Sequence, residues 1–272
     1  MTYLFKNKLL FSVFILLAFF FSSCAPEITL ITISDQCPFK GSMTIYDHKK
    51  AHWFFSDQSD AYRETLPAST FKIINSLIAL EVKAVENENE VLKWDGQEKY
   101  AFGKRVESWE DDSDLKSAFE NSTVWFYVEL AKKIGREQYR NYLLRSHYGN
   151  HNLTEAGDDF WNKGLFAVSP VNQIRFLNAL YENKLPFSQK TMDTVKNIST
   201  VEKTSEYTLH AKTGWAQERD TDIGWWIGYV EKVDNVYFFA TRFIKDSNEK
   251  NDLFDSCRIS ATREALRKLG VL

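Results

Sequence analysis

The chain has 272 residues, a formal charge of −3 and 44% hydrophobic residues, which describe a globular protein of one large or two small domains. Aromatic residues are plentiful and low-complexity tracts are absent, which excludes disorder beyond the first few dozen residues. The slight acidity, without a basic stripe of interleaved aromatic residues, argues against a nucleic-acid partner.

The first residues have the pattern of an export signal. MTYLFKNK carries two lysines, and an apolar run follows that is shorter than the ~20 residues of a membrane-spanning helix. Cys24, after Ser22 and Ser23, resembles the acceptor cysteine of bacterial lipoproteins, although Phe21 stands where leucine is usual. We therefore predict an export signal over 1–24, a periplasmic mature protein and a lipid anchor on Cys24 as its link to the membrane. Simple cleavage nearby, giving a soluble periplasmic form, is the alternative.

Two other cysteines, Cys37 and Cys257, would remain in the exported protein. They are either a disulfide or two buried thiols, and the sequence leaves both open. Because there is no Cys-x-x-Cys motif or cysteine–histidine cluster, we expect no zinc site.

The first half of the chain predicts two strands followed by helices. GSMTIYD and AHWFFS are rich in the aromatic and β-branched residues of strands. Apolar residues recur at helical spacing after LPAST, again between LKSAF and the LLRS of 143–146, and again from Ser169, which we expect to cap a helix with Pro170 at its first position. Gly135 should break the second of these stretches into two helices. The predicted ranges are 41–47 and 51–56 for the strands and 66–85, 115–146 and 169–187 for the helices.

The last third predicts strands and a closing helix. YTLHAKTG, IGWWIGYVE and VYFFATRFI are strand-like runs, and VDN at 233–235 is typical of a hairpin turn. The helix covers 256–270. Strands at both chain ends with helices between them predict an α+β fold, in which one antiparallel sheet of about five strands carries an inserted helical subdomain. Residues 25–272 would form a single domain, with a sheet part at about 25–66 and 190–272 and a helical part at about 67–189.

The stretch PASTFKII places Ser69 and Lys72 three residues apart at the start of a predicted helix. On a helix, this spacing puts the hydroxyl and the amine on one face. They are either a helix cap and a solvated charge, or a nucleophile and its activator, and the pattern alone is too common to decide.

Two further motifs favour catalysis. Ser122-Thr123-Val124 follows about 50 residues later, and Lys212-Thr213-Gly214 about 90 residues after that. Ser-x-x-Lys, a second serine motif and Lys-Thr-Gly, in this order, are the signature of serine enzymes that recognise penicillins. Each motif is weak alone, but their order and spacing are hard to obtain by chance.

The chain resembles the class D β-lactamases, or oxacillinases. The resemblance covers nearly all of the chain after the export signal. It rests on the three motifs above and on Tyr148-Gly149-Asn150, Trp161-x-x-Gly164, KWDG at 93–96, STVWFYVELAKKIG, Ser169-Pro170 and the LPF that follows. The expected fold is that of the serine β-lactamases and penicillin-binding transpeptidases.

The resemblance implies that Ser69 is the nucleophile and Lys72 the general base. An ordinary lysine has a pKa of about 10.4, so only about one in 2,500 is neutral at pH 7. The family's solution is carboxylation of this lysine by carbon dioxide in an apolar pocket, to which Val124 and Trp161 would contribute. The Trp161 N–H could donate to the carbamate; alternatively, Trp161 is a core residue beside Phe160. No cofactor other than carbon dioxide or bicarbonate is expected.

One departure concerns Asn162, because the family commonly has leucine after this tryptophan. A polar side chain there could weaken retention of the carbamate or admit water. Whether it points inward is not readable from the sequence.

The resemblance also assigns the substrate contacts. Ser122 would relay a proton to the departing lactam nitrogen, although either it or Asn121 could instead cap the following helix. Lys212, Thr213 and Arg258 would bind the substrate carboxylate, the last of these being otherwise a solvated charge on the terminal helix. The backbone N–H groups of Ser69 and Trp215 would form the oxyanion hole, and Trp215 would also line the substrate pocket.

Two residues are expected to support the cleft without taking part in the chemistry, namely Tyr148 and Asn150. His147 and His151 flank them, but with Gly149 between and no acidic partner in register we expect a surface turn and no metal.

The resulting hypothesis is an exported serine β-lactamase that hydrolyses penicillins and confers resistance to them. Alternatives are a β-lactam sensor that is acylated without turnover and a cell-wall transpeptidase, although the second motif is wrong for the latter. The preferred β-lactams, the hydrolysis of carbapenems and the oligomeric state are not predicted.

Overall fold

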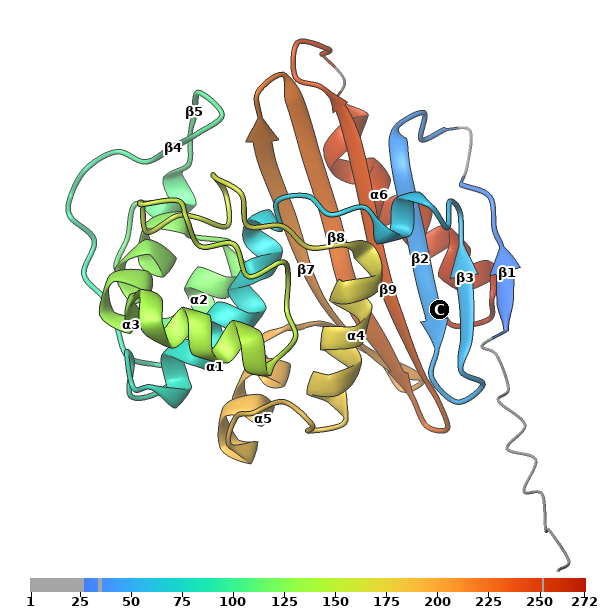
Figure 1. The fold of residues 1–272 in the computed structure, drawn as a ribbon, viewed down its shortest axis with the longest axis horizontal. Helices are drawn as coiled ribbons and strands as arrows, with labels where there is room; N and C mark the ends of the chain where they lie inside the picture. The colour runs from blue at the N-terminus through green and yellow to red at the C-terminus, as the bar shows by residue number, and fades with distance from the viewer. Residues whose placement is uncertain (1–26, 34–35, 251) are drawn as a thin grey trace, which may run out of the picture.

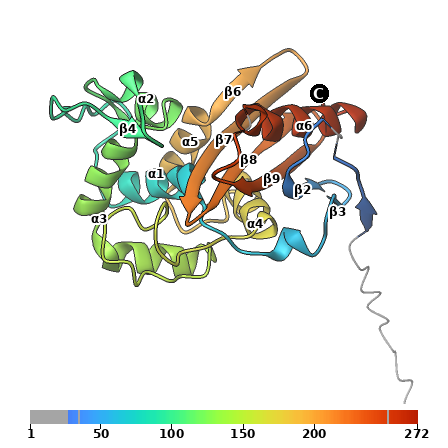
Figure 2. The ribbon, with the colours of Figure 1, turned by 90° about the horizontal axis from the view of Figure 1, so that it is seen from above.

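The computed structural model describes residues 27–33, 36–250 and 252–272, so the predicted export signal and Cys24 lie outside the described residues. Figure 1 shows one twisted sheet, with most helices gathered on one side of it and α6 (Leu253–Lys268) on the other. Figure 2 shows the same layers from above. Within the described ranges, no helix has the length and apolar character needed to cross a membrane.

The sheet is built from both ends of the chain, as the sequence predicts. In the described part of the chain it has seven strands in the order β1-β3-β2-β9-β8-β7-β6. The strands are β1 (Ile28–Leu30), β2 (Lys40–Asp47), β3 (His52–Phe55), β6 (Thr200–Lys203), β7 (Tyr207–Glu218), β8 (Thr221–Lys232) and β9 (Val236–Asp246). The predicted hairpin at 233–235 is confirmed, because the Lys232 N–H donates to the Asn235 carbonyl across it at 2.9 Å.

The sheet differs from the prediction in strand number and in one pairing. The two additional strands, β1 and β6, are short edge strands. Strand β1 runs parallel to β3, so the sheet is mixed at that edge. Strand β6 is made of TVEK, mostly exposed, and such a short polar run carries almost no strand signal.

The predicted boundary at 190 is also wrong, because α5 (Gln189–Ile198) continues the helical part through Ile198. Its buried apolar residues, Met192 and Val195, are three apart, which is the spacing of a helical face.

The other helices are α1 (Lys72–Glu81), α2 (Leu115–Glu120), α3 (Val124–Arg145) and α4 (Pro170–Tyr181). The predicted break at Gly135 is confirmed by its φ of 75°, which glycine adopts at little cost. Residues 121–123 separate α2 from α3, a second break that helical periodicity alone did not reveal. Helix α4 begins at Pro170, and the Ser169 hydroxyl accepts the Asn172 N–H at 3.2 Å, so the predicted cap is confirmed.

A disulfide joins Cys37 to Cys257, with the Cα atoms 5.6 Å apart. It settles the two alternatives that the sequence left open. The bond ties the segment before β2 to helix α6 across 220 residues of chain.

Candidate active site

Ser69 lies in a single 3₁₀ turn, Ala68–Phe71, that leads directly into α1. It makes no capping hydrogen bond; instead its hydroxyl accepts a hydrogen bond from the Lys72 Nζ at 2.8 Å. The preceding residue, Ala68, has a φ of 52°, a conformation that costs free energy in a residue with a side chain. Its N–H donates to the Trp161 carbonyl at 3.0 Å, which helps to hold the strained turn.

Strand β7 passes very close to this turn. A Cβ atom at Gly214 would lie 3.0 Å from the Pro67 carbonyl oxygen and 3.2 Å from the Ala68 Cβ. Glycine at the third position of Lys-Thr-Gly therefore permits the contact between the strand and the turn that carries Ser69. The approach brings the Lys-Thr-Gly motif beside Ser69, although 143 positions separate Ser69 from Lys212.

Lys72 is fully buried, which excludes the reading as a solvated charge. Burial is the main cause that lowers the pKa of its amine well below 10.5, and the positive charge of Lys212 adds to the effect. The Asp159 carboxylate acts in the opposite direction. The ring of Tyr127 lies under the amine, with its centroid 5.0 Å from Nζ. An amine in this setting is held near the neutral state that nucleophilic or basic chemistry requires.

Trp161 packs against Phe71, the residue that precedes Lys72. Its ring is fully buried and stacks on Phe71 at 5.1 Å, and it also meets Phe160 edge-on at 5.2 Å. Its Nε1 is buried and has no hydrogen-bond partner among the described residues. Buried N–H groups are seldom left unpaired, so this atom marks a place where an acceptor is missing. The ring of Trp161 is thus part of the core, and its N–H is a candidate hydrogen-bond donor.

Ser122 and Lys212 form the second polar pair. The Lys212 Nζ donates to the Ser122 Oγ at 2.8 Å and to the Thr213 carbonyl at 3.3 Å. Thr123 occupies the N-cap position of α3, so neither Ser122 nor Asn121 caps that helix. Ser122 has a φ of 59°, a second strained residue in the site.

The Lys212 side chain is buried, with the residue only 5% exposed. Burial, followed by the charge of Arg258, lowers the pKa of its amine to about 7. Arg258 is itself 3% exposed, so it is not a solvated charge. It donates to the Asp255 carboxylate one helical turn away, and this partner was not recognised in the sequence although the Asp-x-x-Arg spacing on α6 could have signalled it.

The candidate residues surround one open cavity of about 620 Å³. Its lining brings together residues from the 3₁₀ turn, the start of α3, β7 and α6. Lys72 and Lys212 are not part of the lining but contact it through their hydrogen bonds to Ser69 and Ser122. The predicted site residues in the lining are Ser69, Ser122, Val124, Thr213, Trp215 and Arg258, together with Gly214 of the Lys-Thr-Gly motif. The lining residues that sequence reasoning did not select as site residues are Tyr100, Ala101, Phe102, Asp159, Lys163, Ala216, Gln217 and Asp255.

The departure at Asn162 also falls in the lining of this cavity. Its Nδ2 donates to the Asp159 Oδ1 at 2.7 Å. Asn162 therefore lies in the wall of the cavity, and its amide is hydrogen-bonded to the neighbouring Asp159 carboxylate.

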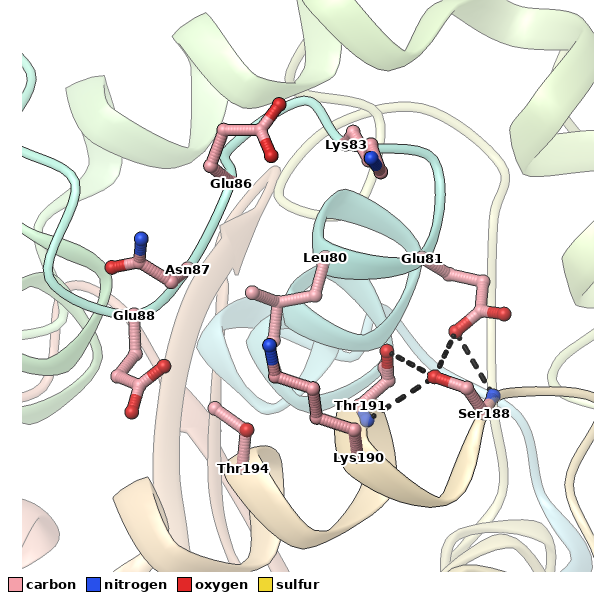
Figure 3. Close-up of a pocket in the computed structure, with 10 residues that line it drawn as sticks. All are labelled: Leu80, Glu81, Lys83, Glu86, Asn87, Glu88, Ser188, Lys190, Thr191 and Thr194. Carbon is pink, nitrogen blue, oxygen red and sulfur yellow. Dashed lines mark hydrogen bonds between the residues drawn. The ribbon is translucent and has the colours of Figure 1, made fainter.

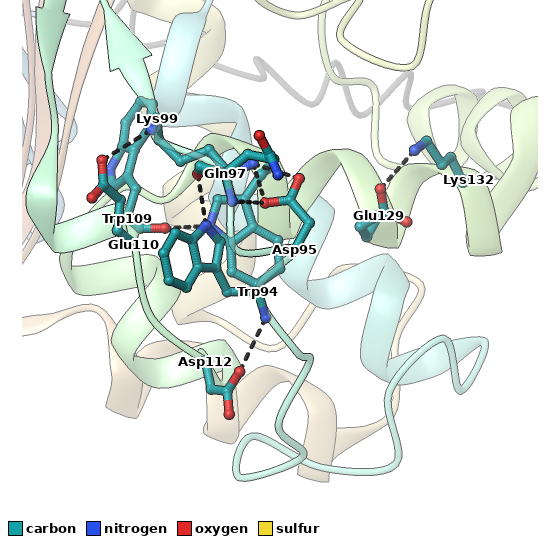
Figure 4. A network of polar contacts seen from close by, with 10 residues as sticks. Trp94, Asp95, Gln97, Lys99, Trp109, Glu110, Asp112, Glu129 and Lys132 are labelled. Carbon is teal, nitrogen blue, oxygen red and sulfur yellow. Dashed lines mark hydrogen bonds and ion pairs between the residues drawn. The ribbon is translucent and has the colours of Figure 1, made fainter.

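One rim of the cavity is held by a polar network over residues 93–112 (Figure 4). The Lys99 ammonium contacts the Asp95 carboxylate at 2.6 Å, and the Lys99 N–H donates to Glu110 at 3.0 Å. The Trp94 N–H donates to Asp112 at 3.1 Å. These bonds fix the short hairpin of β4 (Tyr100–Ala101) and β5 (Lys104–Arg105), which carries part of the cavity wall.

The Tyr-Gly-Asn motif lies beneath the turn that carries Ser69. The Tyr148 hydroxyl donates to Gln173 at 3.0 Å, and the Gln173 amide donates to the Thr70 hydroxyl at 2.8 Å. Asn150 donates to the Leu165 carbonyl at 2.9 Å. This chain of bonds links the motif to the residue next to Ser69, as a supporting role requires. Among the described residues, no group of three or more histidine, cysteine, aspartate or glutamate side chains could hold a metal ion.

A second hollow, of about 200 Å³, lies between the end of α1 and the start of α5 (Figure 3). Its most defined feature is the Glu81 carboxylate, which accepts hydrogen bonds from the Ser188 N–H at 2.9 Å and the Ser188 hydroxyl at 3.0 Å. These bonds join α1 to the beginning of α5 and are structural.

Comparison with known proteins gives a family model and several similar β-lactamases. A family model described as the penicillin binding protein transpeptidase domain matches residues 40–260. β-Lactamase OXA-10 of Pseudomonas aeruginosa is 38% identical over 198 residues, which cover 72% of this chain and 73% of that protein. β-Lactamase OXA-48 of Klebsiella pneumoniae is 36% identical over 233 residues, covering 86% and 84%. The crystal structure of a class D β-lactamase from Sebaldella termitidis superposes with a TM-score of 0.84 at 42% identity, covering 91% of this chain and all of that one.

Proposed function

The chain belongs to the class D β-lactamases, and from this premise we propose that it hydrolyses penicillin-type antibiotics through an acyl-enzyme on Ser69 and so confers resistance to them. The observation that carries the proposal is the bond of 2.8 Å from the buried Lys72 amine to the Ser69 hydroxyl, at the edge of a cavity large enough for a small antibiotic.

In the first half-reaction, the Ser69 Oγ bonds to the lactam carbonyl carbon and the carbon–nitrogen bond of the ring breaks. Ser122, in contact with Lys212 at 2.8 Å, is placed to pass a proton to the departing nitrogen. The backbone N–H groups of Ser69 and Trp215 would stabilise the oxyanion. They belong to the 3₁₀ turn and to β7, whose close approach Gly214 permits. In the second half-reaction the oxygen of a water molecule bonds to the acyl carbon, the ester bond from that carbon to Ser69 Oγ breaks, and the acid leaves as Oγ regains a proton.

The substrate carboxylate would be bound by Lys212, Thr213 and Arg258. Burial is the larger cause of the lowered pKa of Lys212, and repulsion between its ammonium and the buried Arg258 guanidinium adds to it. An anion between them relieves that repulsion and restores the charge on Lys212. Binding of an anionic substrate would therefore offset the cost of keeping Lys212 and Arg258 buried close to one another.

Lys72 is proposed to act as a carbamate. An amine kept neutral by burial can bond to carbon dioxide, and the unpaired indole N–H of Trp161 is a donor that fits an added carboxylate. When formed, this group would supply an anionic general base for both half-reactions. Val124, at the start of α3, lines the cavity and provides apolar surface there.

The test is turnover of a chromogenic cephalosporin by the mature domain. We expect many turnovers per enzyme and a higher rate when bicarbonate is added. A single stoichiometric burst would instead make the protein a β-lactam sensor. The Lys72→Ala variant should slow both acylation and deacylation, and deacylation at the wild-type rate would contradict the proposed base.

We further propose that the protein is exported to the periplasm and anchored by a lipid on Cys24. The support is the basic, apolar and small-residue pattern of the first residues. Mass spectrometry of the membrane fraction would test it, and an unmodified N-terminus downstream of Cys24 would contradict the anchor.

A further inference from the structure

Asp159 is a carboxylate in the wall of the catalytic cavity to which none of the sequence motifs assigns a task. It lies two residues before Trp161 and lines the same cavity as Ser69. Its side chain is 23% exposed, so water screens it only in part.

The position of this carboxylate is fixed by its neighbour Asn162, whose amide donates to Asp159 Oδ1 at 2.7 Å. The backbone supports the same turn, since the Asn162 N–H donates to the Asp159 carbonyl at 3.0 Å. Lys163 approaches Oδ2 only to 3.9 Å with a side chain that is 76% exposed, and such surface pairs contribute little. The charge of Asp159 is therefore held in place without being neutralised.

This charge lies in the same site as Lys72. Asp159 lines the cavity with Ser69, whose hydroxyl is 2.8 Å from the Lys72 Nζ. Two residues further on, Trp161 stacks on Phe71, which directly precedes Lys72, and its carbonyl accepts the Ala68 N–H.

The side chains of Asp159 and Lys72 attract each other when Lys72 is an ammonium ion, and this raises the pKa of the lysine against the effects of burial and of Lys212. The attraction is mutual, because Lys72 lowers the pKa of Asp159 while burial raises it. The interaction changes sign if Lys72 carries a carbamate, since two anions then repel one another.

We propose that Asp159, held by Asn162, is a positioning residue that opposes carboxylation of Lys72 and so sets the carbon dioxide level at which the base forms. The proposal rests on the carboxylation of Lys72 proposed above. In that step the Lys72 nitrogen bonds to the carbon of carbon dioxide and its proton is released to solvent, so a neutral amine becomes an anion. Asp159 stabilises the ammonium ion at the start and destabilises the anion at the end, and both effects favour the unmodified lysine.

The test is ¹³C NMR of the full mature domain titrated with ¹³C-bicarbonate at constant, near-neutral pH, following the carbamate signal. We expect Asp159→Asn to reach half-saturation at about tenfold lower bicarbonate than the wild type, a ratio that corresponds to about 1.4 kcal/mol. Asparagine preserves the shape of the side chain and can still pair with Asn162. The matched control is Asp158→Asn, which removes the same charge one residue away, outside the cavity lining, and should leave the half-saturation point unchanged.

The outcomes separate this proposal from the general one. Equal or weaker carboxylation of Asp159→Asn, or an equal effect of Asp158→Asn, would overturn the role of Asp159 while leaving the carbamate intact. A carbamate signal that appears in Asp159→Asn but not in the wild type would support the role, because it would mean that Asp159 prevents carboxylation of Lys72 over the whole titration. If neither protein shows the signal, both the role and the carboxylation fail, whereas hydrolysis of the cephalosporin is measured independently.

Discussion

Replacing Lys212 by methionine should make the protein more stable while removing a substrate contact. The ordinary pKa of this amine is 10.5, and burial with the charge of Arg258 lowers it to about 7 in the folded protein. Below about pH 7, folding must therefore transfer a charged amine from water into a buried place. The two pKa values differ by about 3.5, and one unit of pKa corresponds to about 1.4 kcal/mol, so the penalty is about 5 kcal/mol at its largest.

The sign of the pH dependence follows from the lowered pKa. The penalty is fully present below the folded-state pKa of about 7, where Lys212 is charged in both states. It shrinks as the pH rises, because the folded protein has already lost the proton while the unfolded chain still holds it. By about pH 9 the advantage of Lys212→Met over the wild type should have fallen by about 2–3 kcal/mol.

The assay is urea unfolding followed by circular dichroism between about pH 6 and about pH 9 without reductant, comparing wild type, Lys212→Met and Lys116→Met. Lys116 is an exposed lysine, so its variant should differ from wild type by no more than about 0.5 kcal/mol at every pH. Comparison with the wild type cancels the titration of groups that do not interact with Lys212. A stability advantage of Lys212→Met that stays constant over this range would refute the reasoning.

Three further changes test other parts of the structure. Trp161→Phe keeps an aromatic ring but removes the unpaired N–H, so we expect ¹³C NMR to show a weaker lysine carbamate; an unchanged signal would remove the indole from that site. Gln173→Leu removes the buried amide that bonds both Tyr148 and Thr70, so the free energy of unfolding should fall by about 1–3 kcal/mol in urea titrations, and a neutral result would mean that the network does not support the turn. Replacing Cys37 and Cys257 together by serine should cost about 2–5 kcal/mol relative to the oxidised wild type, and equal stability would count against a structural disulfide.

Most of the secondary structure follows from local sequence. The strands at 41–47, 207–214, 223–231 and 236–244 are runs of β-branched and aromatic residues, and they fall within observed strands. Ser169 with Pro170 predicts the start of α4 because a cap and a first-turn proline are purely local devices. The short edge strands escaped because β1 and β6 are stabilised by pairing with distant segments, not by their own composition.

The residues of the catalytic signature could likewise be selected from the sequence, since Ser-x-x-Lys, Ser-x-Val and Lys-Thr-Gly keep their order and spacing. Their physical state could not. Whether Lys72 is neutral, whether Arg258 is solvated and whether Ser122 caps a helix depend on what packs around each side chain. A pKa is set by desolvation and by charges from other segments, and residues adjacent in the sequence determine neither of these.

The disulfide and the Asp159–Asn162 pair show the same division. From the sequence, Cys37 and Cys257 could be a disulfide or two thiols, and Asn162 could point into the pocket or away from it. The fold decides them because it brings Cys37 to Cys257 across 220 residues and turns the 158–161 segment so that a carboxylate lies in the cavity wall. Local propensity determines which elements form, whereas the packing of distant elements determines which side chains lose water, and that loss of water gives Lys72 its chemistry.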